Sequence, residues 1–324
     1  MRRKRRQSLF LICLAILIVG VILFLVLRDD EEPYSSDYQN NRPDNTVQYG
    51  GKEYQYNEHL SNYLFMGVDT RDSVTEYETQ EVVGRADTIF LLSYNRVEKT
   101  VTCIAIPRDT MTNVRMIAPD GTDLGTSKEH INMQYVFGDG KDESCRLMKE
   151  AVSDLLYDVP IQGYCSLNLD GIAVAVDALG GVQLVVPDDS LADVNPEFKE
   201  GAAVTITKEN AEQFVRYRDI EKSQSAIVRT NRQKVFLKAL SEQAKQKASE
   251  NVNLIVNMYE ALQPYMVTNM GNDLLADLLS ATFDSENGIQ DIPGVGVEGE
   301  LHDEYHVDEM QLYELVLRVF YKEV

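Results

Sequence analysis

One uncharged, apolar segment constrains this 324-residue chain more than any other feature. The segment runs from Leu9 to Leu27, a stretch of 19 residues with a single glycine. At about 1.5 Å per residue, a helix of this length spans roughly 28 Å, which is close to the apolar thickness of a bilayer. The sequence therefore predicts a transmembrane helix at residues 9–27.

The charges on either side of this segment predict its orientation. Four arginines and one lysine occupy residues 2–6, whereas residues 29–32 are all acidic. The positive-inside rule then places the N-terminus in the cytoplasm and everything after residue 28 outside the cell. A cleaved signal peptide is the alternative, but its apolar part is usually about 7–15 residues long and precedes a small-residue cleavage site. We expect a single-pass protein of the cell membrane, held by an uncleaved signal anchor, with an extracellular main domain.

The net charge argues against a nucleic-acid partner. The chain carries −21, and the residues after position 28 hold 25 basic and 52 acidic side chains, a net charge of −27. Proteins that bind nucleic acid normally present a basic face. An anionic ligand would have to be held by a local arginine cluster or by a metal ion.

Hydrophobic periodicity predicts the fold of the exterior part. Apolar runs rich in β-formers predict strands at residues 63–69, 88–94, 100–107, 163–169 and 182–187. Amphipathic or capped segments predict helices at residues 142–157, 170–181, 208–218 and 224–248, with Asp170 and Thr207 as expected N-caps. Strands that alternate with helices indicate an α/β protein, and we expect a three-layer α-β-α sandwich around a mixed central sheet.

Shifts in composition predict the domain boundaries. Residues 1–8 form a basic cytoplasmic tail before the transmembrane helix, and residues 28–60, polar and acidic, predict a flexible extracellular stalk. The main domain is expected at residues 61–249. Residues 250–324 are expected to be a helical extension packed on it, with helices near 254–262, 274–283 and 308–321.

Three cysteines lie outside the apolar segment. Cys103 falls within an apolar strand and is expected to be a buried thiol. Cys145 and Cys165 are candidates for a disulfide, because an exterior location permits one. Three unpaired thiols are the alternative, and both remain open from the sequence.

Two familiar patterns near the C-terminus carry little weight. Residues 294–299, GVGVEG, match the G-x-G-x-x-G pattern of dinucleotide sites, but they open no helix and no strand–helix–strand unit surrounds them. His302 and His306 are four residues apart, but the glutamate that a zinc protease needs does not follow His302 directly. The sequence therefore predicts neither a nucleotide site nor a zinc site.

Arginines and aspartates recur in short signatures. Arg85 and Asp87 precede one strand, and Arg108 and Asp109 follow the next, so strand pairing would bring the two signatures together. A second set is Arg216 and Arg218 with Arg229, Arg232 and Gln233, of which the last three share one helix face. The guanidinium group binds phosphate through two parallel hydrogen bonds. Structural ion pairs and a solvated helix face are the alternative, but in so acidic a domain the set indicates an anion site.

Six signatures together carry a family resemblance. They are GVDTRD, GRADTI, IPRDT, HINMQYVFGD, VDALGGVQLVVP and RTNRQK, within roughly residues 63–240. In this order they resemble the LytR-CpsA-Psr family of cell-wall ligases. The resemblance implies a phosphotransferase that moves a glycopolymer, such as teichoic acid or capsule, from undecaprenyl pyrophosphate to peptidoglycan through a phosphodiester bond. Residues 61–249 would be its catalytic domain.

The resemblance also implies site residues. Asp69 and Asp87 are expected to hold Mg²⁺, with Mn²⁺ as an alternative. The pyrophosphate-binding set is expected to be Arg85, Arg108, Arg216, Arg218, Arg229, Arg232 and Gln233. Arg108, Asp109 and Arg218 are the expected catalytic residues.

One departure from the family pattern concerns the general base. Relatives usually carry Asp and Gly where this chain has Ala226 and Val228. Asp219 and Asp109 are the candidates to replace that aspartate. The departure also leaves two rival functions open, a regulatory protein that binds the polyprenyl pyrophosphate without transfer, and a pyrophosphatase of lipid carriers.

Overall fold

The computed structural model describes residues 46–71, 73–74, 83–217, 228–229, 232, 235–236, 239–240, 243–244, 246–247, 250–270, 282–283, 289–298 and 303–324. They belong to two compact units. The described residues within Asp29–Leu167, Met266–Gly271 and Ser280–Val324 form the larger unit, and those within Asn168–Tyr265 form the smaller unit. The apolar segment at 9–27 lies outside the described residues. Within the described ranges, no helix has the length and apolar character that crossing a membrane requires.

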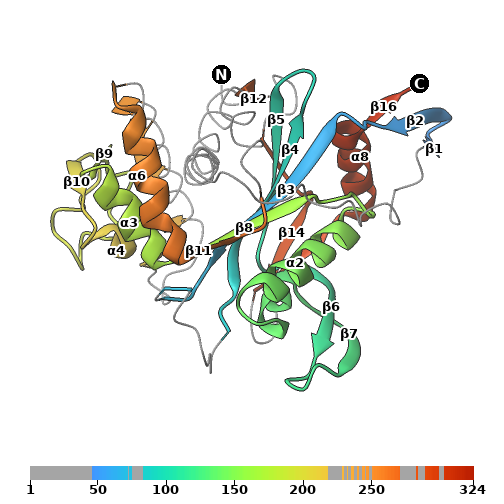
Figure 1. The fold of residues 1–324 in the computed structure, drawn as a ribbon, viewed down its shortest axis with the longest axis horizontal. Helices are drawn as coiled ribbons and strands as arrows, with labels where there is room; N and C mark the ends of the chain where they lie inside the picture. Colours follow the sequence, from blue (N-terminus) through green and yellow to red (C-terminus); the bar gives the residue numbers. More distant parts are fainter. Residues whose placement is uncertain are drawn as a thin grey trace. The chain divides into compact units, whose positions relative to one another are not determined.

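A seven-stranded mixed sheet forms the centre of the larger unit (Figure 1). Its strands, in the order β11-β8-β3-β4-β5-β12 with β13 also on β5, are β3 (Leu60–Val68), β4 (Ala86–Asn95), β5 (Thr100–Ile106), β8 (Gly163–Asn168), β11 (Met266–Thr268), β12 (Thr282–Phe283) and β13 (Ile289–Asp291). The strands β3, β4 and β5 are antiparallel neighbours, whereas β12 and β13 run parallel to β5. The expected α/β class and mixed central sheet are therefore confirmed.

A tight turn sets the register of β4 against β5. The side-chain oxygen of Asn95 accepts hydrogen bonds from the backbone N–H groups of Val97 (3.0 Å) and Glu98 (3.1 Å). Lys99 closes the turn with a φ of 57°. Because this turn pairs Asn95 with Thr100, the start of β4 and the end of β5 meet at the opposite end of the sheet.

Two helices and a 3₁₀ segment cover one face of this sheet (Figure 1). They are α2 (Asp142–Leu155), α8 (Glu309–Phe320) and η2 (Ile131–Phe137). The apolar faces of α2 and α8 bury Met148, Val152, Leu312 and Phe320 in one core with alternate side chains of β3, β4 and β5. Alternation along the strands is what aims those side chains at the helices. The helices predicted at 142–157 and 308–321 are confirmed.

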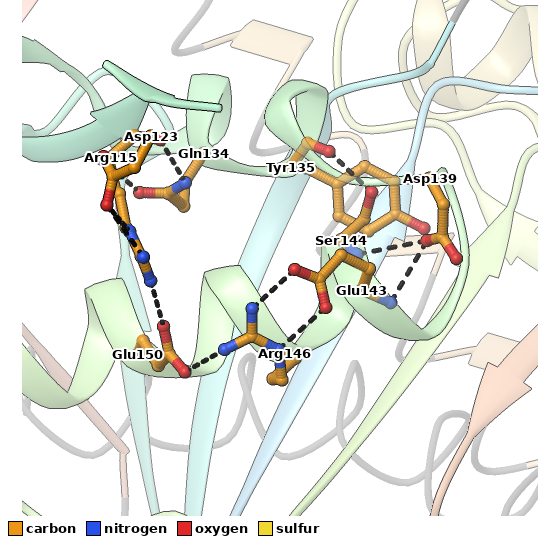
Figure 2. A network of polar contacts seen from close by, with 9 residues as sticks. All are labelled: Arg115, Asp123, Gln134, Tyr135, Asp139, Glu143, Ser144, Arg146 and Glu150. Carbon is orange, nitrogen blue, oxygen red and sulfur yellow. Dashed lines mark hydrogen bonds and ion pairs between the residues drawn. The ribbon is translucent and has the colours of Figure 1, made fainter. Parts of the chain in front are cut away.

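The start of α2 is held by a dense set of polar contacts (Figure 2). One carboxylate oxygen of Asp139 accepts hydrogen bonds from the backbone N–H groups of Lys141 (2.7 Å), Glu143 (3.1 Å) and Ser144 (3.2 Å). These donors are among those that the first turn of a helix leaves unpaired. A Cβ at Gly138 would collide with the backbone of Ser144, so the chain can approach the helix this closely only with glycine.

The ends of the larger unit differ from the expectation. Residues 46–56, expected in the flexible stalk, form the hairpin β1 (Thr46–Tyr49) and β2 (Lys52–Tyr56). The strand β2 pairs with β16 (Tyr321–Glu323), so the stalk prediction is wrong for this stretch. The expected helical extension contains β11, β12 and β13 of the central sheet and a hairpin of β14 (Gly294–Glu298) and β15 (Asp303–Val307). The expectation of a helical extension is therefore wrong for these residues, because β11, β12 and β13 pair with β8 and β5, far away in the sequence, and β14 pairs with β15.

The smaller unit contains the remaining elements. They are α3 (Asp170–Ala178), β9 (Val182–Val185), β10 (Ala203–Ile206), α4 (Ala211–Arg216), α6 (Val252–Leu262) and η3 (Gln263–Tyr265). Asp170 is the first helical residue rather than the cap, and the side-chain oxygen of Asn168 accepts from Gly171 N–H at 3.2 Å. Thr207 does not cap α4 with its side chain, because that helix starts later, after Asn210. The described residues between 224 and 248 are helical, as predicted. Of the helix expected at 274–283, residues 274–281 lie outside the described residues, and residues 282–283 form the strand β12, so the helix prediction is wrong there.

The three cysteines that the structure describes form no disulfide with one another. Cys145 and Cys165 are free, buried thiols, and Cys103 is buried as well. The Cys145 thiol on α2 donates to the hydroxyl of Ser166 at 3.5 Å. Because neighbouring strand residues point to opposite faces, Cys165 points away from α2, and the candidate pair Cys145–Cys165 is wrong. Burial raises the pKa of Cys145 to about 12, so this thiol is structural.

Candidate functional site

The Arg/Asp signatures meet at one end of the central sheet. The β3–β4 register pairs Gly67 with Thr88 but Val68 with Ala86, so Asp87 is an extra residue without a partner on β3. A bulge of this kind redirects a side chain and is common beside active sites. It separates Asp87 from the regular alternation that buries Ala86 and Ile89.

Asp69 and Arg85 lie next to each other at this end. The backbone N–H of Arg85 donates to the Asp69 carboxylate at 2.5 Å, and the N–H of Asp69 donates to the Arg85 carbonyl at 3.1 Å. A Cβ on Gly84 would collide with Thr70 and stand 3.0 Å from that carboxylate. The glycine of the GRAD signature is therefore required for the close approach of these two segments. The side chain of Arg85 is exposed.

Arg108 links two carboxylates from the neighbouring segments. Its guanidinium lies 2.8 Å from the carboxylate of Asp87 and 3.3 Å from that of Asp109. Burial by itself lowers the pKa of Arg108, but the two carboxylates outweigh it, and the net pKa is raised. The three side chains are each about one-third exposed, so a ligand can reach a cation whose charge is fixed.

Asn132 is a site residue that the sequence analysis missed. It belongs to η2, is 4% exposed, and its backbone N–H donates to the carbonyl of Arg108 at 3.3 Å. Its amide nitrogen donates to Asp87 at a long 3.5 Å. Its side-chain oxygen is buried without a hydrogen-bond partner among the described residues. A buried acceptor of this kind is costly unless a ligand or water completes it.

His130, directly before η2, was also missed. Its ring nitrogen Nδ1 lies 4.0 Å from Asp109 Oδ1, and its side chain is 18% exposed. The signal was present in the sequence, since both residues belong to the HINMQYVFGD signature. Without the fold, nothing placed that signature beside Arg108.

The donor set at this end fits Mg²⁺ better than a transition metal. Among the residues that the structure describes, no group of three or more His, Cys, Asp or Glu side chains could hold a metal ion. Mg²⁺ usually takes one or two carboxylates and completes its shell with water and phosphate oxygens. Asp69 and Asp87 at adjacent strand ends supply two carboxylates, and the amide oxygen of Asn132 is a further hard acceptor nearby.

The second predicted set of residues belongs to the smaller unit. Arg216 is exposed and forms an ion pair with Glu212 at 2.6 Å. Arg229 is partly buried in the helical segment. Arg218 and Gln233, together with Asp219 and Ala226, lie outside the described residues. The phosphate-binding roles of this set remain predictions.

Arg232 has a structural role in the smaller unit. It is 1% exposed, and its guanidinium donates hydrogen bonds to the carbonyls of Phe214 and Tyr217 and to the hydroxyl of Ser190. Burial lowers the pKa of this guanidinium, and the nearby Arg229 acts in the same direction, while Asp188 opposes them. The contacts fix the C-terminal end of α4, whose last carbonyls would otherwise be unpaired. Its expected contact with phosphate stays a prediction.

The two weak patterns near the C-terminus lie in the hairpin β14–β15. Residues 294–298 of GVGVEG form a strand rather than a loop before a helix. His306 pairs with Glu304 at 2.7 Å, and His302 lies outside the described residues.

The comparison with family models decides the family. The model of the LytR_cpsA_psr family matches residues 24–316. The chain belongs to the LytR-CpsA-Psr family. Residues 69–132, which build the site described above, lie inside this match.

Two curated relatives are both named as teichoic acid transferases. The chain is 32% identical to the polyisoprenyl-teichoic acid–peptidoglycan teichoic acid transferase TagU of Halalkalibacterium halodurans. This alignment of 186 residues covers 57% of the chain and 54% of the relative. It is 28% identical to the transferase TagV of Bacillus subtilis, which has the same descriptive name. This alignment of 306 residues covers 87% of the chain and 71% of the relative. The match to TagU thus spans just over half of that protein.

Solved structures show the same fold. The crystal structure of B. subtilis TagV is 27% identical, with a TM-score of 0.57, over 80% of this chain and 95% of that one. A structure of TagT bound to LI-WTA is 18% identical, with a TM-score of 0.57, over 88% of this chain and 97% of that one. At that identity, the likeness to TagT concerns the fold alone.

Proposed function

We propose that this protein transfers a glycopolymer from a polyprenyl-pyrophosphate carrier to a sugar hydroxyl of peptidoglycan, leaving a phosphodiester bond. The observation that carries the proposal is the Arg108 guanidinium between Asp87 and Asp109, beside Asp69 and Arg85. The names of TagU and TagV, and the family match over most of the chain, support the same reaction.

Phosphoryl transfer requires that the phosphate charge is neutralised and that the acceptor and leaving oxygens are aligned, more than it requires covalent catalysis by the protein. The acceptor oxygen attacks phosphorus, and the bond from phosphorus to the polyprenyl phosphate breaks. The phosphate oxygens carry the developing charge, and arginine forks are suited to stabilise it. Arg108 and Arg85 are assigned this role in the larger unit, and Arg218, Arg229 and Gln233 are assigned it from the family pattern.

Mg²⁺ is the proposed cofactor, with Asp69 and Asp87 as the residues that would hold it. When bound, it would supply positive charge to the pyrophosphate oxygens. Asp87 accepts a hydrogen bond from Arg108 at 2.8 Å, so each of these two groups positions the other.

We also propose that the helix at residues 9–27 anchors the protein in the cell membrane, with the catalytic part outside. The basic flank before it and the acidic flank after it support this orientation. We further propose that the domain has three layers, with helices on both faces of the sheet. The prenyl chain of the carrier would lie in an apolar space between the sheet and one layer of helices.

The test is a transfer assay on the full-length protein in detergent. It uses a polyprenyl-pyrophosphate-linked oligosaccharide, a peptidoglycan fragment and Mg²⁺, and mass spectrometry identifies the products. We expect a joined product that contains a phosphodiester, and its loss in Asp87→Asn or after chelation. Release of phosphate without joining would instead support the pyrophosphatase, and lipid binding without either product would support the regulatory protein.

A further inference from the structure

Two side chains at the site each leave one oxygen atom without a polar partner. Asp87 accepts hydrogen bonds from Arg108 at 2.8 Å and from the amide nitrogen of Asn132 at 3.5 Å, and both contacts use its Oδ1 atom. The second oxygen of Asp87, Oδ2, has no polar partner among the described residues. The side-chain oxygen Oδ1 of Asn132 is likewise buried and unpartnered there. A ligand that completes this end of the sheet therefore meets two oxygen atoms that both need a positive charge or a donor.

The Asp87 carboxylate determines which way round the Asn132 amide lies. The amide nitrogen faces Asp87 Oδ1, since the reversed amide would place two acceptor atoms against each other. Nitrogen and oxygen are bonded to the same amide carbon, so Asn132 Oδ1 also lies near this carboxylate. Oxygen atoms that carry negative charge repel at short range, and a cation that binds both of them removes the repulsion.

The backbone brings Asn132 to this position. Between β5 and η2 the chain forms a hairpin of β6 (Met111–Ile117) and β7 (Asp123–His130). On its return, the N–H of Asn132 donates to the carbonyl of Arg108 at 3.3 Å. The amide of Gln134 then exchanges two hydrogen bonds with the backbone of Arg115, at 2.8 and 2.9 Å, which fastens η2 to the hairpin (Figure 2). With the backbone held on both sides, the side chain of Asn132, which is 4% exposed, has a fixed place beside Asp87.

We propose that Asn132 is a third protein ligand of the cation, which it binds through Oδ1 together with Oδ2 of Asp87. The assignment rests on the proposed function, which gives Mg²⁺ to Asp69 and Asp87. Amide carbonyl oxygens are hard donors that suit this ion. Protein kinases likewise hold Mg²⁺ on nucleotide phosphates with an aspartate and an asparagine.

A hydrogen-bond donor of the substrate fits the two oxygen atoms less well. An ionised pyrophosphate offers only acceptors, so it cannot complete the Asn132 oxygen. The acceptor hydroxyl has one proton and serves only one of the two atoms, whereas a cation binds both. The cation is therefore the ligand that leaves neither Asp87 nor Asn132 with an unpaired oxygen.

The assignment also separates two tasks of Asp87. Its Oδ1 atom holds Arg108 at 2.8 Å, and its Oδ2 atom is left for the cation. Binding of the cation is then compatible with this ion pair. Because Arg108 is itself a nearby positive charge, Arg108→Ala should not lower the affinity for the cation.

The experiment measures Mn²⁺ binding to the full-length protein in detergent by electron paramagnetic resonance, with Mn²⁺ as the probe and no lipid present. The specific site is the one that is lost in Asp87→Ala, which separates it from loose binding to the acidic surface. Replacing groups that only support metal ligands typically costs about 10- to 100-fold in metal affinity, so Asn132→Leu should weaken the specific site at least about tenfold. In the Asp87→Ala background, Asn132→Leu should have no further effect.

Asn62 offers a matched control. Its side chain is 0% exposed, and its Oδ1 atom is also buried without a partner among the described residues. It lies near the other end of β3, opposite Ser93 of β4. Its amide nitrogen donates to the hydroxyl of Tyr56 at 3.2 Å and to the carbonyl of Pro160 at 2.8 Å rather than to a carboxylate. Asn62→Leu should lower the melting temperature and leave the Mn²⁺ affinity unchanged.

Asn132→Asp distinguishes a ligand from a residue that only holds Asp87 in place. The variant keeps an oxygen at this position and adds a negative charge, so it should bind Mn²⁺ at least as tightly as the wild type. If Asn132 acted only by donating its amide N–H to Asp87, the same variant would lose that contact and bind Mn²⁺ as weakly as Asn132→Leu. This comparison decides even where Asn132→Leu does not fold.

Two results would overturn the assignment of Asn132. One is equal Mn²⁺ affinity in the wild type and in folded Asn132→Leu, and the other is weakened binding in folded Asn132→Asp. Absence of joined product in the transfer assay would instead overturn the proposed function. The two failures are distinguishable because Mn²⁺ binding is measured without lipid or acceptor.

Discussion

Replacing Arg108 with alanine distinguishes a ligand site from an internal ion pair. In the structure its guanidinium contacts the carboxylates of Asp87 at 2.8 Å and Asp109 at 3.3 Å, and all three side chains are about one-third exposed. Ion pairs with this much exposure typically contribute about 0–1 kcal/mol to folding stability. We therefore expect Arg108→Ala to lower the melting temperature only slightly.

The effect on ligand binding should be much larger. Losing one charge-assisted hydrogen bond to a phosphate costs about 1.5–3 kcal/mol, which is roughly a ten- to 150-fold loss of affinity. The same substitution thus has a small expected effect on folding and a large one on polyprenyl-pyrophosphate binding. The test therefore compares the loss of lipid affinity with the loss of folding stability in the same variant.

Arg146 offers a matched control. It lies on α2, is 39% exposed and also pairs with two carboxylates, those of Glu143 and Glu150. Arg146→Ala should match the small stability loss of Arg108→Ala but leave lipid affinity unchanged. Melting can be followed by circular dichroism and binding by a fluorescent polyprenyl-pyrophosphate analogue, which meets no tryptophan background because the chain has none. If folded Arg108→Ala binds the lipid as tightly as Arg146→Ala does, the pyrophosphate site is refuted.

Two other predictions concern stability. Arg232→Ala and Arg232→Lys should each lower the free energy of unfolding by about 2–4 kcal/mol, because lysine cannot reproduce three divergent hydrogen bonds to one buried and two partly buried acceptors; urea denaturation with an unchanged midpoint would contradict this. With its pKa raised from 9.0 to about 12, Cys145 should stay protonated in the folded protein, so its contribution to stability is complete below pH 9 and is lost as the pH rises toward 12. A Cys145→Ser variant should show a shallower decline of stability over that range, and an identical decline would refute the assignment.

Local patterns were sufficient for the elements whose contacts are close in sequence. The strands β3, β4 and β5 were predictable because β-formers alternate around one tight turn, and α2 and α8 because an apolar stripe recurs at helical spacing. The hairpin β1–β2 was not, since its polar residues are ordered by pairing with β16, far away along the chain. The two-residue strand β12 and the three-residue strands β11 and β13 are too short to show any period.

The sequence was sufficient to predict the charged residues of the site, but not the residues that lie next to them. The positions of Arg85, Asp87, Arg108 and Asp109 at strand ends followed from the order of strands and turns. Asn132 and His130 depend on where a hairpin brings the chain back, which no local pattern states. The candidate pair Cys145–Cys165 was wrong because the exterior location says nothing about which face of β8 each residue meets: Cys145 of α2 contacts Ser166, and its neighbour Cys165 points to the other face.

The discontinuous larger unit has a consequence for folding during synthesis. Its core needs Leu312, Leu315 and Phe320 of α8, yet the segment Asn168–Tyr265 of the smaller unit is inserted between β8 and β11 and is made first. The first half of the central sheet must therefore wait at the outer side of the membrane with the area that α8 covers still exposed, while the intervening hundred or so residues are translocated. A chaperone that shields this area outside the membrane should raise the yield of folded protein more than one that acts after translocation is complete, and slowing translocation of the inserted segment should lower the yield.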